Sequence, residues 1–171
     1  MRVSSRPIIL TGLVASATLL TACASVGNVK PGTSYNNLLE QYGKPNVICP
    51  AKNGSTRLVW SEGASGEQAW AVTVDKEQRV ANVTQLMDKS GFDVLNQGQW
   101  DTHDVRCHFG TPAMVRTYGD SKTDMVWQYR FYGPAGGYDM LFVTFDRATD
   151  QMVSYSTGPD PELNMTLLGG R

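Results

Sequence analysis

Residues that could do chemistry are densest in the eight positions from Asp101, which hold two aspartates, two histidines and a cysteine. On a helix, His103 and Cys107 would be neighbours one turn apart, and Asp104 and His108 would form a second such pair. Pairs of this kind can ligate a metal ion. A capping role is favoured instead, because Asp101 is a typical N-cap residue and Asp104 would then lie at the third helical position. We therefore predict a capped helix with solvated histidines, no metal and no other cofactor.

The remainder of the chain has no catalytic signature. It contains no Gly-x-Ser-x-Gly nucleophile turn, no Ser-x-x-Lys motif and no glycine-rich phosphate-binding loop. Carboxylate pairs such as Asp120/Asp124 or Asp160/Glu162 fall in turn-rich segments that give no signal of an apolar pocket. We predict that the protein is not an enzyme.

Cys23 follows an N-terminal export signal. Arg2 and Arg6 precede an uncharged apolar run that is shorter than the roughly 20 residues of a membrane-spanning helix. The segment Leu20-Thr21-Ala22-Cys23 resembles the lipobox of bacterial lipoproteins, in which the cysteine becomes the first mature residue and carries lipid. The resemblance implies a signal peptide over 1–22, a lipidated tether over 23–33 and, because Ala24 is not an aspartate, an outer-membrane location. The alternative is an ordinary signal peptide with an incidental cysteine.

Cys49 and Cys107 are the two cysteines that would remain after Cys23 is lipidated. An even number of cysteines in an oxidising compartment favours a disulfide, although two separate thiols are the alternative. A bridge would close a loop of about 58 residues and could contribute roughly 4 kcal/mol to stability.

Composition limits the class of protein. The 171 residues are 41% hydrophobic and 18% charged, with a formal net charge of −1, which is typical of a globular chain. A nucleic-acid-binding protein that neutralises phosphates needs a basic face, which this balance does not favour.

Two segments of the chain resemble each other, which predicts an internal duplication. The first two matches recur at an offset of 67 residues, and the third recurs at 71, with extra residues in a Gly/Pro-rich turn. The matches are Gly-x-Pro at 43–45 and 110–112, Trp60 and Trp127, and Val-Thr-x-Asp at 72–75 and 143–146.

Each copy is predicted to contain one short helix and three strands. Ser34 and Asp101 are N-cap types, and Gly43 and Gly110 lie where a helix C-terminus favours glycine. The predicted strands are about 57–61, 68–75 and 80–86 in the first copy and 125–132, 140–146 and 152–156 in the second. We predict an α+β fold in which units 34–86 and 98–157 form one antiparallel sheet with helices on one face, followed by a loose tail over 158–171.

Aromatic residues gather on the first strand of the second copy. Alternation predicts that Trp127, Tyr129 and Phe131 face the core. Arg130 and Tyr132 would then lie on the opposite face beside Tyr138, which makes these three a candidate partner surface.

The order of helix, Gly-x-Pro, Trp-containing strand and two further strands behind a lipobox resembles the SmpA/OmlA (BamE-like) outer-membrane lipoprotein family. The match is best over 98–155, especially 98–112 and 124–132, and looser over 32–86. It implies a non-enzymatic, periplasm-facing lipoprotein that acts by protein–protein contact in outer-membrane protein assembly or envelope integrity. Its partners would be the membrane, through the lipid, and an envelope protein such as the β-barrel assembly machinery. The tandem arrangement also resembles β-lactamase-inhibitor proteins, so the alternative is a membrane-tethered inhibitor or ligand-binding module.

Overall fold

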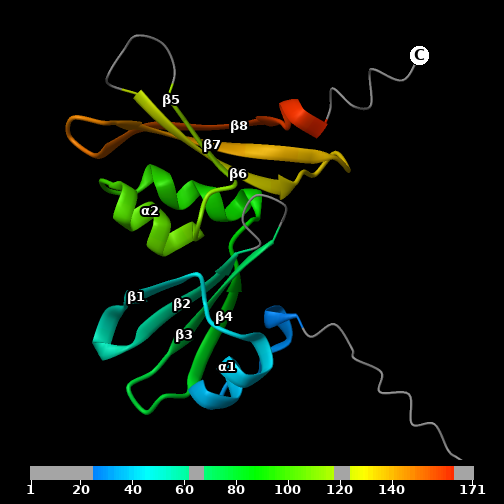
Figure 1. The fold of residues 1–171 in the computed structure, drawn as a ribbon, viewed down its shortest axis with the longest axis vertical. Coiled ribbons are helices and arrows are strands. Elements are labelled where there is room, and N and C mark those ends of the chain that lie inside the picture. The colour runs from blue at the N-terminus through cyan, green and yellow to red at the C-terminus, as the bar shows by residue number, and fades with distance from the viewer. Residues whose placement is uncertain (1–24, 62–67, 118–123, 164–171) are drawn as a thin grey trace, which may run out of the picture.

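The computed structural model describes residues 25–61, 68–117 and 124–163. It has a mixed α+β fold in which two antiparallel sheets lie on either side of a helical layer (Figure 1). Residues 161–163 are helical, and the other helical segments of the described residues are two α-helices and three short 3-10 helices. They are η1 (Val26–Asn28), α1 (Tyr35–Tyr42), η2 (Lys52–Gly54), η4 (Lys89–Asn96) and α2 (Thr102–Phe109).

Each sheet has four strands that pair in chain order. The first contains β1 (Val47–Pro50), β2 (Thr56–Ser61), β3 (Ala69–Val74) and β4 (Val80–Gln85). The second contains β5 (Met114–Thr117), β6 (Asp124–Tyr132), β7 (Tyr138–Asp146) and β8 (Gln151–Pro159). The predicted α+β class is confirmed. The prediction of a single sheet is wrong, and so is the count of three strands per half, because the short strands β1 and β5 were not predicted.

Burial explains why the strands form two stacked sheets. Side by side, the strands would have offered one broad face that two short helices could cover only in part. Stacked, each sheet buries an apolar face against the same helical layer, which consists of η4 and α2 (Figure 1). This main core contains Val59, Ala69, Ala71, Leu86, Met87, Phe92, Leu95, Val105, Phe109, Trp127, Tyr129, Phe131, Leu141, Val143 and Phe145.

The other face of the first sheet covers a smaller core under α1 and η1. Leu38 of α1 packs there with Leu58 of β2 and Val72 of β3. The prediction that the helices share one face is therefore wrong, since α1 and α2 lie on opposite faces of this sheet. The physical reason is that neighbouring residues of β2, Leu58 and Val59, are both apolar and point to opposite faces.

The helix ends agree with the sequence. The Ser34 hydroxyl accepts a hydrogen bond from the backbone N–H of Asn37, and the Asp101 carboxylate accepts one from Asp104. Gly43 and Gly110 follow the two helices with φ of 73° and 86°, a conformation that strongly favours glycine. The predicted starts and ends of both helices are confirmed.

The predicted loose tail is wrong for its described part. Gly158 and Pro159 belong to β8, and the Asp160 side chain is completely buried. Residues 164–171 of the predicted tail lie outside the described residues.

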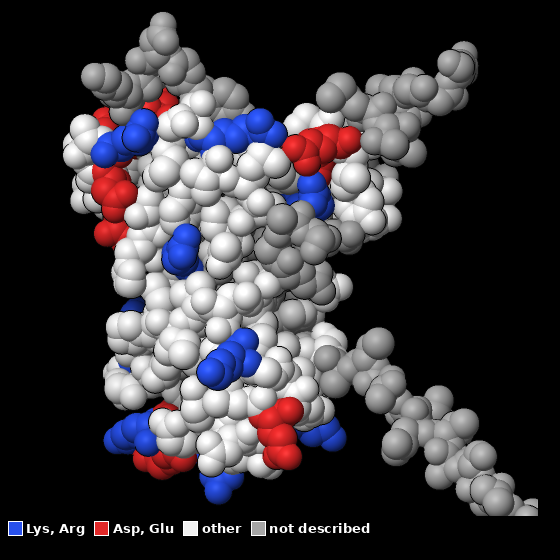
Figure 2. All heavy atoms as spheres, viewed as in Figure 1, with Lys and Arg blue, Asp and Glu red and all other residues white. Residues whose placement is uncertain are grey.

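Within the described ranges, no helix is long and apolar enough to cross a membrane. On the face seen in Figure 2, charged side chains gather mainly at the two ends of the molecule, and the band between them is largely uncharged. The described residues of that face form no continuous basic patch of the kind that tracks a nucleic-acid backbone.

Candidate functional site

A disulfide joins the two halves of the chain where the first sheet meets the helical layer. It links Cys49 of β1 to Cys107 of α2, with a Cα–Cα distance of 5.8 Å and a sequence separation of 58 positions. Cys49 is buried, with 3% of its surface exposed, whereas Cys107 is partly exposed. The predicted pairing is confirmed, and the bridge holds α2 against the first sheet.

His103 lies one turn before Cys107 on α2 and adds an imidazole to the two sulfurs. Its Nε2 is 3.5 Å from the Cys107 Sγ, and the imidazole is exposed. Among the described residues, the potential ligand atoms of Cys49, His103 and Cys107 all lie within 4.8 Å of one another. The sequence predicted the His103–Cys107 proximity, but the approach of Cys49 follows from the stacking of the first sheet against α2.

Arg57 of β2 reaches the C-terminal end of α2 from the first sheet. Its Nε donates a hydrogen bond to the carbonyl oxygen of Cys107 at 3.0 Å, and its Nη2 donates one to that of His108 at 3.1 Å. A cation at this end satisfies carbonyls that have no partner within the helix and complements the helix dipole. Partial burial lowers the pKa of Arg57. Sequence reasoning missed this contact, because nothing local connects residues 50 positions apart.

His108 lines a cavity of about 350 Å³ beside the disulfide, together with Arg57, Trp100 and Cys107. Its ring lies edge-on to Trp100, with centroids 5.3 Å apart. Burial, with a smaller contribution from the charge of Arg57, lowers the pKa of His108 from 6.5 to about 4. The prediction of a solvated histidine is wrong at this position, and His108 is neutral near pH 7.

The two aspartates of the same segment act as helix caps. The Asp101 carboxylate accepts from the backbone N–H of Asp104, and the Asp104 carboxylate accepts from that of Asp101, which completes a capping box. The predicted capping role is confirmed. Both carboxylates therefore stabilise the start of α2, about two turns before its C-terminal end, and Asp104 also lines the cavity.

The predicted partner surface is divided by the structure. Tyr132 is 60% exposed and packs edge-on against Tyr138 across the β6–β7 hairpin, with ring centroids 5.9 Å apart. Arg130, in contrast, has only 10% of its side chain exposed and forms an ion pair with Asp160. The two tyrosines remain a surface pair, whereas Arg130 belongs to an internal network.

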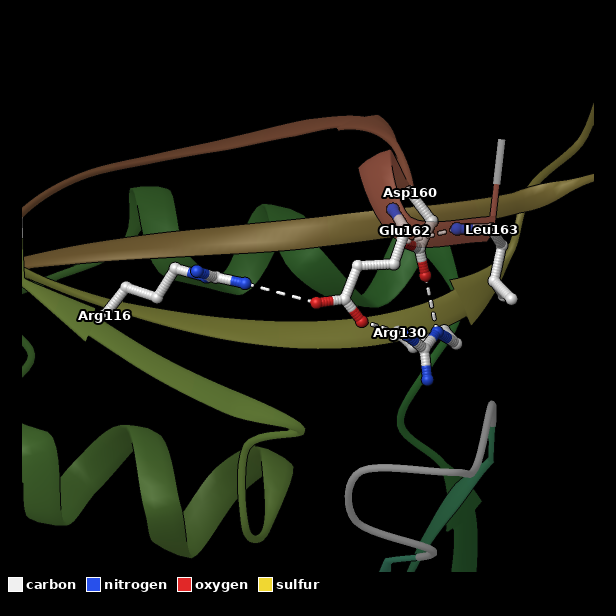
Figure 3. A network of polar contacts seen from close by, with 5 residues as sticks. All are labelled: Arg116, Arg130, Asp160, Glu162 and Leu163. Atoms are coloured by element: carbon white, nitrogen blue, oxygen red, sulfur yellow. Dashed lines mark hydrogen bonds and ion pairs between the residues drawn. The ribbon is translucent and has the colours of Figure 1, made fainter. Parts of the chain in front are cut away.

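That network fixes residues 160–163 to the outer face of the second sheet. Arg130 Nε donates to the Asp160 carboxylate at 2.5 Å, and Glu162 lies between Arg130 and Arg116, 3.8 Å and 3.1 Å from their Nη2 atoms (Figure 3). Burial alone would raise the pKa of Asp160. Hydrogen bonds from Arg130 and from the backbone N–H groups of Glu162 and Leu163 outweigh it, so the pKa is lowered.

Cys23, the predicted lipidation site, lies outside the described residues. In comparisons with known proteins, no family model, curated protein or solved structure matches this chain. The structure thus brings Cys49, His103 and Cys107 together at one place. It leaves Tyr132 exposed beside the half-buried Tyr138 on the β6–β7 hairpin.

Proposed function

We propose that this protein is a lipid-anchored envelope protein that acts by protein–protein contact, as its resemblance to the SmpA/OmlA family implies. The observation that carries the proposal is the segment Leu20-Thr21-Ala22-Cys23, placed directly after a basic and then apolar N-terminus. A cysteine at this place can take a diacylglyceryl thioether, and more than one acyl chain gives stable membrane anchoring. Because Ala24 follows Cys23, the proposed location is the outer membrane, facing the periplasm.

The Cys49–Cys107 disulfide supports an exported protein. Disulfides persist in oxidising compartments and are rare where glutathione and thioredoxin keep thiols reduced. A bridge that joins the two halves would also stabilise the domain.

The fold part of the proposal is a duplication, in which each copy is a helix followed by four strands. Several backbone features recur in both halves. Each N-cap residue, Ser34 and Asp101, forms a bridge next to the start of the fourth strand, and each third strand has a register shift inside its Val-Thr-x-Asp segment. Recurrence of such irregular features supports a common origin more strongly than recurrence of helix and strand order alone.

Trp60 and Trp127, which match in the sequence at an offset of 67, do not occupy equivalent positions in the two proposed copies. Trp60 Nε1 donates a hydrogen bond to the Gly43 carbonyl oxygen, and in the second half the Tyr129 hydroxyl donates to the Gly110 carbonyl oxygen. Tyr129, rather than Trp127, is therefore the counterpart of Trp60. The offset grows from 67 residues at the helices to 69 at these strands and 71 at the next ones.

The proposed contact surface centres on Tyr132, supported from the side by Tyr138. Tyrosine is enriched at the centres of protein interfaces, because it buries a large rigid ring and keeps a polar hydroxyl. The edge-on contact with Tyr138 restrains the Tyr132 ring before binding, which lowers the entropy that a partner must offset.

Mass spectrometry of the protein extracted from membranes tests the anchoring proposal. A mature chain that begins at Cys23 and carries diacylglycerol and an N-linked acyl chain is the expected product. The Cys23→Ser variant should keep its signal peptide or leave the membrane fraction. An unmodified mature chain that begins at another residue would refute lipid anchoring.

A further inference from the structure

The two cysteines of the disulfide and His103 would form the ligand set of a metal site if the disulfide were reduced. Cys49 comes from β1, and His103 and Cys107 come from successive turns of α2, so the three ligands belong to two elements that the fold packs together. Cys and His are the ligands that zinc prefers, and three protein ligands leave a fourth position for water.

One ligand–ligand distance, that between Cys107 Sγ and His103 Nε2, already fits a zinc site. Zinc binds thiolate at about 2.3 Å and imidazole nitrogen at about 2.0–2.1 Å, which in a tetrahedron places these two atoms about 3.6 Å apart. The Cys107 Sγ and His103 Nε2 are 3.5 Å apart. Two thiolates on one zinc lie about 3.8 Å apart. From a disulfide of about 2.0 Å, the Cys49 sulfur would therefore move by roughly 2 Å, a side-chain rotation.

The surroundings give access and place one cation close to the ligand residues. The Arg57 guanidinium donates a hydrogen bond to the backbone carbonyl oxygen of Cys107. The cavity of about 350 Å³ reaches Cys107 from solvent, and His103 is exposed, so an ion and its water ligand can enter. Asp101 and Asp104 are held in the capping box and are not needed as ligands.

We propose that the reduced protein binds one zinc-like divalent cation through Cys49, Cys107 and His103. Two equivalents of a thiol reductant open the disulfide, giving two protein thiols and the oxidised disulfide of the reductant. Metal binding then displaces one proton from each thiol, and the neutral His103 donates its Nε2 lone pair. Disulfide and metal use the same sulfurs, so they exclude each other, and either one links β1 to α2.

The site belongs to the reduced chain. In an oxidising compartment it is populated before the disulfide forms, or after a thiol reductant opens it. The inference does not rest on the proposed function, since it needs neither the lipid nor a protein partner.

Titration of the reduced, metal-free protein with Co²⁺ tests the proposal. We expect one ion per chain, with a thiolate-to-cobalt charge-transfer band and the visible d–d bands of a tetrahedral site. The oxidised protein should give no thiolate band. His103→Gln should weaken Co²⁺ binding by about 100-fold or more, because loss of an outer-shell partner alone costs about 10–100-fold.

Arg106→Gln is the matched control, because Arg106 is exposed on the same helix but belongs neither to the ligand set nor to the cavity lining. This variant should bind Co²⁺ as the wild type does. Circular dichroism of each reduced sample reports whether the chain is folded. The proposal is overturned if the reduced wild type gives no thiolate band, or if His103→Gln binds as tightly as the wild type. The same spectrum from reduced protein in concentrated urea would also overturn it, since the site requires β1 to be packed against α2.

Discussion

A His108→Gln variant should lose less stability than the wild type when the pH falls from 7 to 5. In the folded protein, burial and the Arg57 charge lower the pKa of His108 to about 4, against an ordinary value of 6.5 in the unfolded chain. The unfolded chain therefore binds the proton first. The stability that depends on neutral His108 is complete above pH 6.5 and is lost as the pH falls toward 4.

The size of the effect follows from the two pKa values. A shift of one pKa unit corresponds to about 1.4 kcal/mol, so the whole contribution is about 3 kcal/mol, to within a factor of two. At pH 5 nearly all unfolded chains carry the proton on His108, whereas about one folded chain in ten does. The wild type should therefore lose about 2 kcal/mol more than His108→Gln between pH 7 and pH 5.

Urea unfolding at the two pH values measures this difference. Glutamine also removes the ring contact with Trp100, which changes the stability at every pH. The diagnostic quantity is therefore the change in unfolding free energy between pH 7 and pH 5, and not the stability at pH 7. His103→Gln is the control, because it removes an exposed histidine from the same helix. Equal losses in the wild type and His108→Gln would refute the buried neutral imidazole.

Three further predictions concern the disulfide, the outer network and the helix ends. Reduction of the disulfide should lower the unfolding free energy by about 4 kcal/mol, measured by urea denaturation with and without reductant, because the bridge closes a 58-residue loop. Asp160→Asn should cost about 3 kcal/mol at pH 7, because it leaves Arg130 without its buried counter-charge, whereas Glu162→Gln, at a half-exposed position, should cost at most about 1 kcal/mol. Similar losses in both variants would contradict the burial of the first pair. Gly110→Ala should lower the melting temperature more than Gly43→Ala does. Both have positive φ, but only at Gly110 would the added methyl lie 3.0 Å from side chains of β2.

Local features of the fold could be predicted from the sequence. The ends of both helices follow from cap residues and glycines that act within one turn. Alternation along β6 correctly placed Trp127, Tyr129 and Phe131 in the core, where each is at most 6% exposed. These predictions succeeded because their physical causes lie within a few residues of one another.

The stacking of the sheets could not be predicted in the same way. Alternation along a strand shows which face is apolar, but it does not say whether two sheets join at their edges or bury their faces against a shared layer. Phe92 and Leu95 of η4 contained the missing signal, since two apolar residues three positions apart in the segment between the predicted units point to a buried helical turn. With that turn in place, a third layer between the sheets would have been expected.

The site was predicted in part for the same reason. The pairing of Cys49 with Cys107 followed from the expected lipidation of Cys23 and an oxidising compartment, which leave two cysteines. The contact of Arg57 with α2 and the ion pair of Asp160, in contrast, depend on segments 30 or more residues apart. Alternation along β6 correctly places Arg130 on the face that points away from the main core, and we therefore expected its side chain to be exposed. Asp160 and Glu162 pair with it from a segment 30 residues further along the chain, and no local pattern around residue 130 predicts that contact.

Photo-crosslinking in intact cells tests the central claim, contact with an envelope protein, most directly. A crosslinking amino acid in place of Tyr132 in the full chain should yield one discrete adduct with an envelope-assembly protein. The same amino acid in place of Ile48, which is equally exposed but lies on β1, should not. Recovery of a soluble periplasmic enzyme at Tyr132 would favour the tethered-inhibitor alternative. Identical adducts from both positions, or none from Tyr132, would contradict the proposed contact surface.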